Sequence, residues 1–296
     1  ELANFMGSAP IVSPEITDSG VTFRISAPYA DNVKLNGSWM QGMGESAVMT
    51  KSANGVWSIT IPTPIPELYT YSFNVDGISY NDPANVFMQR DGTRYLSVLL
   101  VPGEATANYF EATQRGNLSQ VWYDSPTLGI NRRLFVYTPY GYNKGTTKYP
   151  VLYLLHGAGG DEDAWSTMGR TCQIMDNLIE KGLAKPMLVV MPNGNPTQQA
   201  ARTTMLAEVP IDRTAPGYDP NGYVNSIVKD IVPYIESNYR VIAKPNSRAL
   251  AGLSMGAGHT ISCTNLYPGF FSYICPLSNG IRVTDENKAT YEEQFK

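Results

Sequence analysis

The hydrophobic pattern of the chain changes near residue 101, and this change constrains the fold more than any other feature. Before it, short segments alternate apolar and polar residues, as in 21–25, 56–61 and 69–75. Such alternation places one face of a strand on a core and the other face in water. Turn dipeptides, Asn54-Gly55 and Asp76-Gly77, lie between these segments. Residues 1–100 are therefore predicted to form an all-β sandwich.

The chain from residue 117 to residue 296 has the pattern of a different fold class. It follows a polar stretch of small residues, 101–116, which we interpret as a linker. Continuous apolar runs predict strands that are covered on both faces, and they span 134–137, 151–155, 187–191 and 249–251. Helical stretches lie between them at 171–182 and 224–239, the second with an apolar stripe of Ile227, Ile231, Tyr234 and Ile235. Alternating strands and helices predict an α/β domain with a mostly parallel sheet.

A glycine-flanked serine is the strongest chemical feature of the sequence. The segment 252–256, Gly-Leu-Ser-Met-Gly, follows an apolar run and precedes a helical stretch of small residues, which is the context that a G-x-S-x-G nucleophile requires. The strand must turn sharply into the helix, so the serine projects at the carboxyl end of the sheet. The helix N-terminus and the Met255 amide can then stabilise an oxyanion. We predict that Ser254 is a catalytic nucleophile; an ordinary glycine-rich turn is the alternative.

A second glycine-rich loop follows the apolar run that ends at Leu155. Its sequence, His-Gly-Ala-Gly-Gly at 156–160, lets backbone N–H groups point toward the serine, as in the oxyanion holes of hydrolases with this topology. Ala158 is the predicted second donor, and a simple turn between strand and helix is the alternative. His156 is expected to support the loop by hydrogen bonding and not to act as the catalytic base.

Several separated motifs together resemble a known family. They are the loop at 154–160 with Trp165 behind it, and the segments 190–194, 233–239 and 251–256. In this order they are similar to the esterase D-type α/β-hydrolases and, within that group, to the bacterial feruloyl and acetyl-xylan esterases of carbohydrate esterase family 1. The resemblance covers residue 117 to the end. It implies an α/β-hydrolase fold and the hydrolysis of esters on plant cell-wall polysaccharides such as xylan.

The first domain resembles, more weakly, the family 48 carbohydrate-binding modules and related immunoglobulin-like domains. The similar segments are 55–57 and 71–77. Trp39 and Trp57 could stack on sugar rings, because flat aromatic faces suit the apolar sides of pyranoses. For Trp57, which lies in an alternating strand, burial in the sandwich core is the favoured interpretation. Sugar binding and packing against the esterase domain both stay open as roles for this domain.

The remaining members of a catalytic triad have no suitable position in the sequence. In this fold the acid and then the histidine follow the serine. Of the two histidines, His156 precedes Ser254, and His259 lies about 140° around a helix from it and about 7.5 Å along the axis. His259 is therefore expected to be a packing residue. Asp285, in a polar stretch, is rejected as the acid, and both partners are expected beyond Lys296, in a C-terminal part that this sequence lacks.

Other candidate residues carry weaker signals. Trp165 and Asn193 follow predicted strand ends, where ligand-facing loops lie in α/β sheets, so they are candidates for lining the acyl or sugar site; packing and loop hydrogen bonding stay open for both. No His, Cys, Asp or Glu group has metal-ligand spacing, and no glycine loop has a phosphate-binding pattern, so neither a metal nor a cofactor is expected. The cysteines lack close pairing and are expected to be buried apolar residues: Cys172, Cys263 and Cys275.

Composition excludes two classes of partner. The net charge is -4 and no lysine or arginine cluster is present, so nucleic acid is not an expected partner. No apolar run approaches the roughly 20 residues of a membrane helix. The chain begins at Glu1, not Met, which suggests a trimmed secreted or periplasmic product, although a cloning boundary gives the same start.

Together these features predict a two-domain serine esterase that acts on feruloyl or acetyl esters of a polysaccharide through an acyl-enzyme. Two alternatives stay open. One is a carbohydrate-binding protein that keeps the hydrolase scaffold without catalysis, because fold alone does not define function. The other is an esterase of a different acyl specificity.

Overall fold

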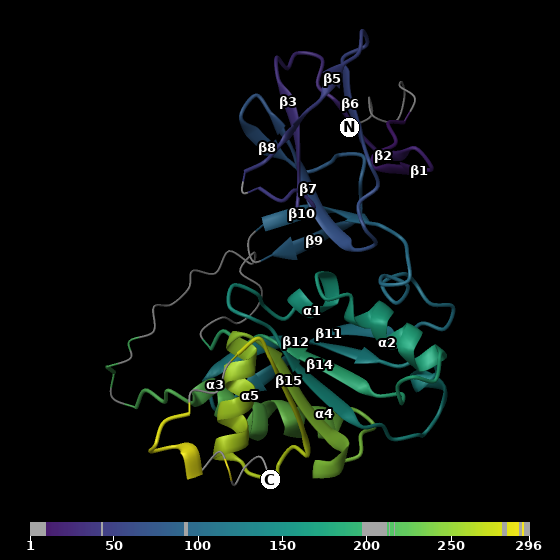
Figure 1. Ribbon diagram of the computed structural model, residues 1–296. Helices are drawn as coiled ribbons and strands as arrows, with labels where there is room; N and C mark the ends of the chain where they lie inside the picture. The colour runs from purple at the N-terminus through teal and green to yellow at the C-terminus, as the bar shows by residue number, and fades with distance from the viewer. Residues whose placement is uncertain are drawn as a thin grey trace. The chain divides into compact units, whose positions relative to one another are not determined.

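The chain forms two compact units, Glu1–Phe110 and Glu111–Lys296, in the computed structural model (Figure 1). The structure describes residues 10–42, 44–91, 94–196, 212, 214–215, 217–279, 283–289 and 292. The division between the units falls inside the stretch that the sequence marks as a linker, 101–116. The last part of this stretch belongs to the second unit, where the Gly116 amide donates to Asp176 at 2.8 Å.

The first unit is a sandwich of two antiparallel sheets, as the alternating sequence pattern predicts. One sheet has the strand order β1 (Glu15–Thr17), β2 (Gly20–Ser26), β6 (Val56–Ile61) and β5 (Thr50–Lys51). The other has the order β4 (Ala47–Val48), β3 (Val33–Gly37), β7 (Leu68–Val75), β10 (Arg94–Leu100) and β9 (Met88–Asp91), and β8 (Ile78–Tyr80) also pairs with β7.

Aromatic side chains fill the core of this sandwich. Phe23 of β2 and Phe73 of β7 are fully buried. Trp57 is only 6% exposed, so the interpretation of Trp57 as a core residue is confirmed. Trp39 is partly buried against the same core and stacks on Phe23, with ring centroids 5.5 Å apart. Both indoles therefore contribute to the interior of the unit.

The second unit is built on one mixed sheet of six strands. Their order is β11 (Asn117–Ser125), β12 (Ile130–Thr138), β14 (Leu188–Pro192), β13 (Val151–Leu155), β15 (Arg248–Leu253) and β16 (Tyr273–Leu277). The last four strands are mutually parallel, whereas β11 and β12 are antiparallel to their neighbours. Every residue of β14 is buried, as expected for a strand that is covered on both faces.

Helices cover both faces of this sheet (Figure 1). On one face lie α1 (Ala164–Thr167) and α2 (Thr171–Glu180), packed on a cluster that contains Tyr137, Leu154 and Met191. On the other face lie α5 (Met255–Leu266) and a helix of three consecutive segments: α3 (Gly222–Ser226), η4 (Ile227–Ile231) and α4 (Val232–Asn238). Short 3₁₀ turns occur at η2 (Tyr142–Lys144) and η5 (Pro245–Ser247).

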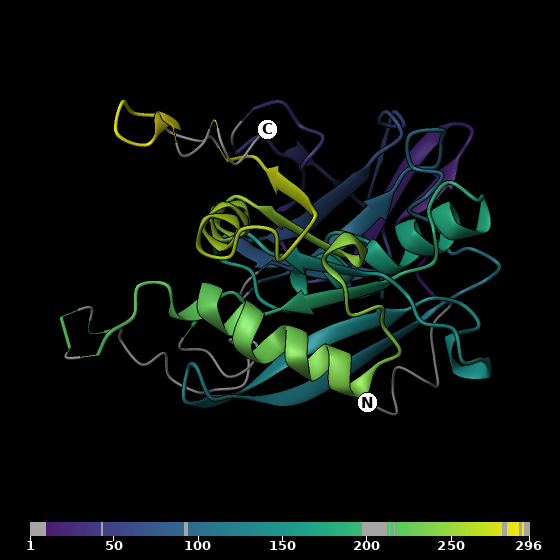
Figure 2. The same cartoon turned by 90° about the horizontal axis from the view of Figure 1, so that it is seen from below.

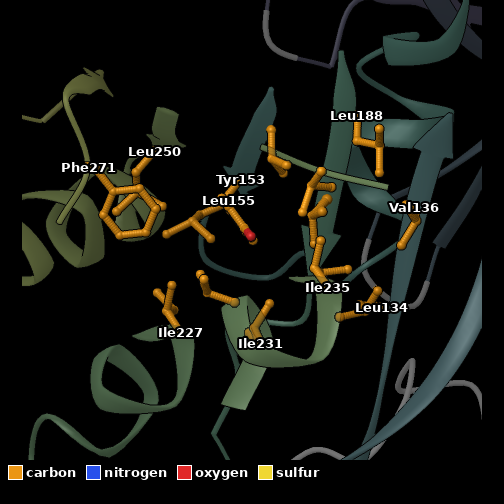
Figure 3. Packing of buried hydrophobic residues seen from close by; sticks show 14 of the residues in the cluster. Leu134, Val136, Tyr153, Leu155, Leu188, Ile227, Ile231, Ile235, Leu250 and Phe271 are labelled. Carbon is orange, nitrogen blue, oxygen red and sulfur yellow. The ribbon is translucent and has the colours of Figure 1, made fainter. Parts of the chain in front are cut away.

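The helix from Gly222 to Asn238 has the apolar stripe that its sequence predicts. The helix runs along one face of the sheet (Figure 2). Ile227, Ile231 and Ile235 are fully buried and face Leu134, Val136, Leu188 and other side chains of the sheet (Figure 3). Its middle segment, η4, is a turn of π-helix that ends at Ile231, two residues before Pro233. Proline has no backbone N–H to donate to the preceding turn, so a local change of helix type at this point has a physical cause.

The cysteines differ from the expectation in one case. Cys263 is buried and Cys172 is partly buried, but Cys275 of the edge strand β16 is exposed, so the prediction that all three are buried is wrong for Cys275. All three are free thiols.

In the described ranges, no helix has the length and apolarity to cross a lipid bilayer.

Candidate active site

Ser254 occupies the sharp bend between β15 and α5. Its backbone has φ 51° and ψ -107°, a conformation that is costly for a residue with a side chain. The bend is held because the Ser254 amide donates to the Leu277 carbonyl at 2.8 Å and the Gly258 amide donates to the Ser254 carbonyl at 3.0 Å. The serine side chain is exposed. The hydroxyl therefore projects from the carboxyl edge of the sheet at the start of a helix.

The flanking glycines are required by close backbone contacts. A Cβ atom on Gly252 would lie 2.3 Å from the carbonyl of Gly256, and one on Gly256 would lie 2.6 Å from the Leu155 carbonyl oxygen. Real Cβ atoms do not approach backbone atoms this closely. The glycines of the G-x-S-x-G pattern are thus needed because β15, α5 and the end of β13 meet at this point and leave no space for a side chain.

The glycine-rich loop after β13 lies beside the serine. A Cβ atom on Gly157 would be 3.7 Å from the Cβ of Ser254 and 3.4 Å from the Leu253 carbonyl oxygen. Ala158, the next residue, is exposed. Neither the Ala158 amide nor the Met255 amide has a hydrogen-bond acceptor among the residues that the structure describes. Both N–H groups are thus available as donors close to the hydroxyl.

His156 ties this loop to the loop after β14. Its Nε2 accepts a hydrogen bond from the Gly194 amide at 2.7 Å, and its Nδ1 lies 2.8 Å from the Gly157 carbonyl oxygen. One nitrogen accepts and the other donates, so the ring is neutral. The side chain is 2% exposed, and this burial lowers its pKa. Both ring nitrogens are occupied in supporting the loops, as the sequence interpretation expects.

Asn193 has a structural position in the loop after β14. It is fully buried; its side-chain Nδ2 donates to Glu162 at 3.0 Å, and its Oδ1 accepts from the Asn195 amide at 2.9 Å. With both ends of the amide occupied, the structure favours loop hydrogen bonding, one of the two roles left open for this residue, over contact with a ligand.

Trp165 lies on α1 and is partly buried against the cluster that packs α1 and α2 on the sheet. Its ring would be 2.5 Å from a Cβ atom on Gly169, so the ring packs closely on the turn between the two helices. Its indole nitrogen has no acceptor among the described residues. The geometry again favours packing, the alternative left open for this side chain.

Two arginines support the same loops, and sequence analysis did not identify them. Arg132 is fully buried and donates to the carbonyl oxygens of Asn193, Asn195 and Pro196. Arg133 forms a 2.7 Å ion pair with the buried Glu162, whose pKa is raised chiefly by burial. The sequence signal that could have identified these arginines is their position directly before the apolar run 134–137.

His259 lies on α5, five residues after the serine. Its ring packs on Tyr223, with centroids 4.7 Å apart, and its Nδ1 has no hydrogen-bond partner among the described residues. Burial lowers the pKa of His259 to about 4, with a contribution from His156. Asp285 is exposed in a turn after β16. Neither of the two histidines of the sequence is placed to take a proton from Ser254.

The assembled site contains an exposed hydroxyl, two free amides and a helix N-terminus. This arrangement can bind a carbonyl group and stabilise negative charge on its oxygen. Within the described part of the chain, no group of three or more His, Cys, Asp or Glu side chains is placed to hold a metal ion.

Comparison with known proteins agrees with this geometry. The model of the Esterase family matches residues 125–292, and that of carbohydrate-binding module 48, the isoamylase N-terminal domain, matches residues 6–88. A curated relative, an endo-1,4-beta-xylanase/feruloyl esterase of Xylanibacter ruminicola, is 33% identical over 287 residues, which is 93% of this chain and 37% of the relative. The chain therefore spans little more than a third of that protein.

Two further proteins are similar at lower sequence identity. Esterase Rv1288 of Mycobacterium tuberculosis is 28% identical over 159 residues, covering 53% of this chain and 31% of its own length. The solved structure of the enterobactin esterase FES from Shigella flexneri has a TM-score of 0.59 at 15% identity, covering 87% of this chain and 70% of its own chain. The latter likeness supports the fold alone.

Proposed function

Since this chain belongs to the Esterase family of carboxylic ester hydrolases and carries a family 48 carbohydrate-binding module before its catalytic unit, we propose that the protein is a serine esterase for ester-linked feruloyl or acetyl groups on a plant cell-wall polysaccharide such as xylan. The observation that carries this proposal is the exposed Ser254 at the strained bend between β15 and α5, beside two unoccupied amides. A serine in an ordinary turn would not require the backbone contacts of Gly252 and Gly256.

In the proposed reaction, the Ser254 hydroxyl oxygen attacks the ester carbonyl carbon, and the carbonyl oxygen becomes an oxyanion held by the Ala158 and Met255 amides. Collapse of this intermediate breaks the bond to the alcohol oxygen of the sugar and leaves the acyl group on Ser254. Water then attacks the acyl-enzyme and releases the acid. In the first half of the reaction the Ser254 proton passes to a base and from the base to the departing sugar oxygen, which leaves as a hydroxyl. In the second half the attacking water gives a proton to the same base, which returns it to the Ser254 oxygen.

That base is not one of the two histidines of this sequence, because His156 is bonded at both nitrogens and His259 packs on Tyr223. We therefore propose that a histidine outside these 296 residues serves as the base.

The occupied positions of both histidines also favour a second candidate function, a carbohydrate-binding protein on a hydrolase scaffold. A serine without a base keeps only the rate acceleration that comes from substrate binding and from the oxyanion donors.

The substrate and the location of the protein follow from the same proposal. The relative from Xylanibacter ruminicola is named for xylanase and feruloyl esterase activities, and the carbohydrate-binding module suits a polymeric substrate. A cell-wall polysaccharide is too large to enter a cell, so a secreted or periplasmic location is proposed with it.

Hydrolysis of methyl ferulate and of acetylated xylan by the full-length protein tests the proposal. We expect Ser254→Ala to lower kcat by a factor of about 10⁴ or more. Ser278→Ala is a matched control, since Ser278 is also exposed, follows a strand and has φ 53°; its activity should equal that of the wild type. The substrate that is hydrolysed identifies the acyl group. Equal activity of Ser254→Ala and wild type would refute the proposal, and a complete lack of hydrolysis would favour the binding protein.

A further inference from the structure

Three of the four tryptophans of the sequence pack inside the units, and one is exposed at the edge of the second unit. Trp57 is buried and Trp39 stacks on Phe23 inside the sandwich. Trp165 of α1 is partly buried against the cluster that packs this helix on the sheet. Trp122 of β11 is the remaining tryptophan of the four in the sequence, and it is 50% exposed. A half-exposed indole on an edge strand needs an explanation, because tryptophan is among the side chains that contribute most to binding surfaces.

The Trp122 ring is held in a fixed orientation. Arg133 lies directly opposite it on β12 and places its guanidinium carbon 5.7 Å from the ring centroid. The guanidinium is itself held in place, because it donates to the buried Glu162 at 2.7 Å. One side of the indole is thus supported by a neutralised cation, while half of the side chain stays in contact with solvent. Such preorganisation reduces the entropy that is lost when a ligand binds.

Polar side chains flank the indole on the same face of the strand. Gln120 and Asp124 lie two residues before and after Trp122, so all three project to one side. Both flanking residues are exposed, and Asp124 accepts a hydrogen bond from Asn131 at 2.8 Å. An aromatic face between an amide and a carboxylate matches a pyranose, which has an apolar ring face and peripheral hydroxyl groups.

Trp122 lies at the same edge of the sheet as Ser254. The pair Trp122–Arg133 is one step beyond the pair Leu134–Pro192, at the carboxyl end of β14. The carboxyl ends of β13 and β15, after which Ser254 follows, lie at this edge too. Four strand spacings of about 4.8 Å separate β11 from β15, so the indole and the serine are roughly 19 Å apart across the sheet. A polysaccharide chain of a few sugar units bridges this distance.

We infer that Trp122, flanked by Gln120 and Asp124, is a sugar-binding platform that holds the main chain of a xylan-type polysaccharide while Ser254 acts on an ester attached to it. The inference rests on the proposed function for its substrate class. It assigns polymer binding to the catalytic unit itself, at a position separate from the carbohydrate-binding module. A small ester without a sugar chain does not reach this platform.

Binding of soluble arabinoxylan and xylohexaose to the full-length protein tests the inference without catalysis, in a Ser254→Ala background. Isothermal titration and quenching of tryptophan fluorescence give the affinity. We expect Trp122→Ala to weaken binding about tenfold and Trp122→Phe to restore part of the affinity. Tyr140→Ala is the matched control: Tyr140 is an aromatic residue with 51% exposure that follows the carboxyl end of β12, at the edge of the sheet opposite to Ser254, and its loss should leave the affinity unchanged.

Kinetics with the serine restored separate this inference from the proposed function. Trp122→Ala should raise KM for feruloylated arabinoxylan about tenfold and leave kcat and KM for methyl ferulate unchanged. Hydrolysis of methyl ferulate together with unaltered polymer binding and KM in Trp122→Ala would overturn the platform and leave the esterase intact. Absence of measurable xylan binding by the parent protein would also overturn the platform. Loss of all esterase activity with Ser254 present would overturn the proposed function instead.

Discussion

Gly252 and Gly258 are both close to Ser254, but only Gly252 faces backbone that cannot move. A Cβ atom on Gly252 meets the Gly256 carbonyl at 2.3 Å, whereas one on Gly258 meets only the side-chain nitrogen of Asn279 at 3.2 Å. We expect Gly252→Ala to lower the free energy of unfolding by about 3 kcal/mol and to abolish ester hydrolysis. Gly258→Ala should be neutral, or more stable by up to about 1 kcal/mol, because alanine favours helix. Urea unfolding measures both, and equal stabilities would refute this account of the motif.

His259 makes the stability of the second unit dependent on pH. Its pKa is about 4 in the folded protein and 6.5 without burial, so between these values the unfolded chain binds a proton that the folded chain does not. Stability is therefore fully present above pH 6.5 and is lost as the pH falls toward 4. We expect the wild type to lose on the order of 3 kcal/mol relative to His259→Gln across this window.

Urea unfolding of the two proteins between pH 7.5 and pH 4.5 checks this prediction, and the comparison cancels the effect of the other titrating groups. His156 also has a lowered pKa, but it is present in both proteins. If the free energies of unfolding of the two proteins change equally with pH, the protonation of His259 does not affect stability.

At the scale of elements, Arg132 connects the start of β12 to the loop after β14. Its guanidinium is fully buried and donates to three carbonyl oxygens of that loop. A lysine ammonium cannot reproduce this planar fork. We expect Arg132→Lys to lower the free energy of unfolding by about 2–4 kcal/mol. Arg94→Lys, at a side chain that is 70% exposed, should change it by less than about 0.5 kcal/mol; similar losses in both would contradict this role.

The type and order of the elements could be predicted from the sequence, because the hydrophobic period differs between the units. The apolar stripe of the helix at 222–238 was also predictable, but the π turn before Pro233 was not, since it depends on how the backbone adapts to one missing N–H. The buried position of Arg132 was equally out of reach. A charged residue is expected at the surface unless the chain offers carbonyl groups that only the fold brings together.

Within the site, local motifs were predictable and side-chain environments were not. Ser254, Ala158 and the supporting role of His156 follow from residues that are close in sequence. Asn193 was considered for the ligand site because it follows a strand, but its amide is occupied by Glu162 and Asn195 in the folded chain. Cys275 was expected to be buried, yet it lies on an edge strand, where one neighbour is missing among the described elements.

At the scale of the whole molecule, each unit has a hydrophobic core of its own. Among the residues that the structure describes, the core of the sandwich is formed by side chains from within residues 21–101, such as Phe23 and Phe73. We therefore expect residues 1–110 to fold alone, with the dispersed amide spectrum of a β protein by NMR. Phe73→Ala should destabilise this fragment by about 3–5 kcal/mol. A fragment that remains unfolded would show that its stability depends on the second unit.

In the proposed reaction Ser254 becomes covalently acylated. Rapid quenching of the full-length protein with a slowly deacylating feruloyl ester, followed by peptide mass spectrometry, tests it directly. We expect one feruloyl group on the peptide that contains Ser254, and the same adduct in the Ser278→Ala control. An adduct on a different residue, or turnover of the ester with no adduct on Ser254 at any time, would contradict it.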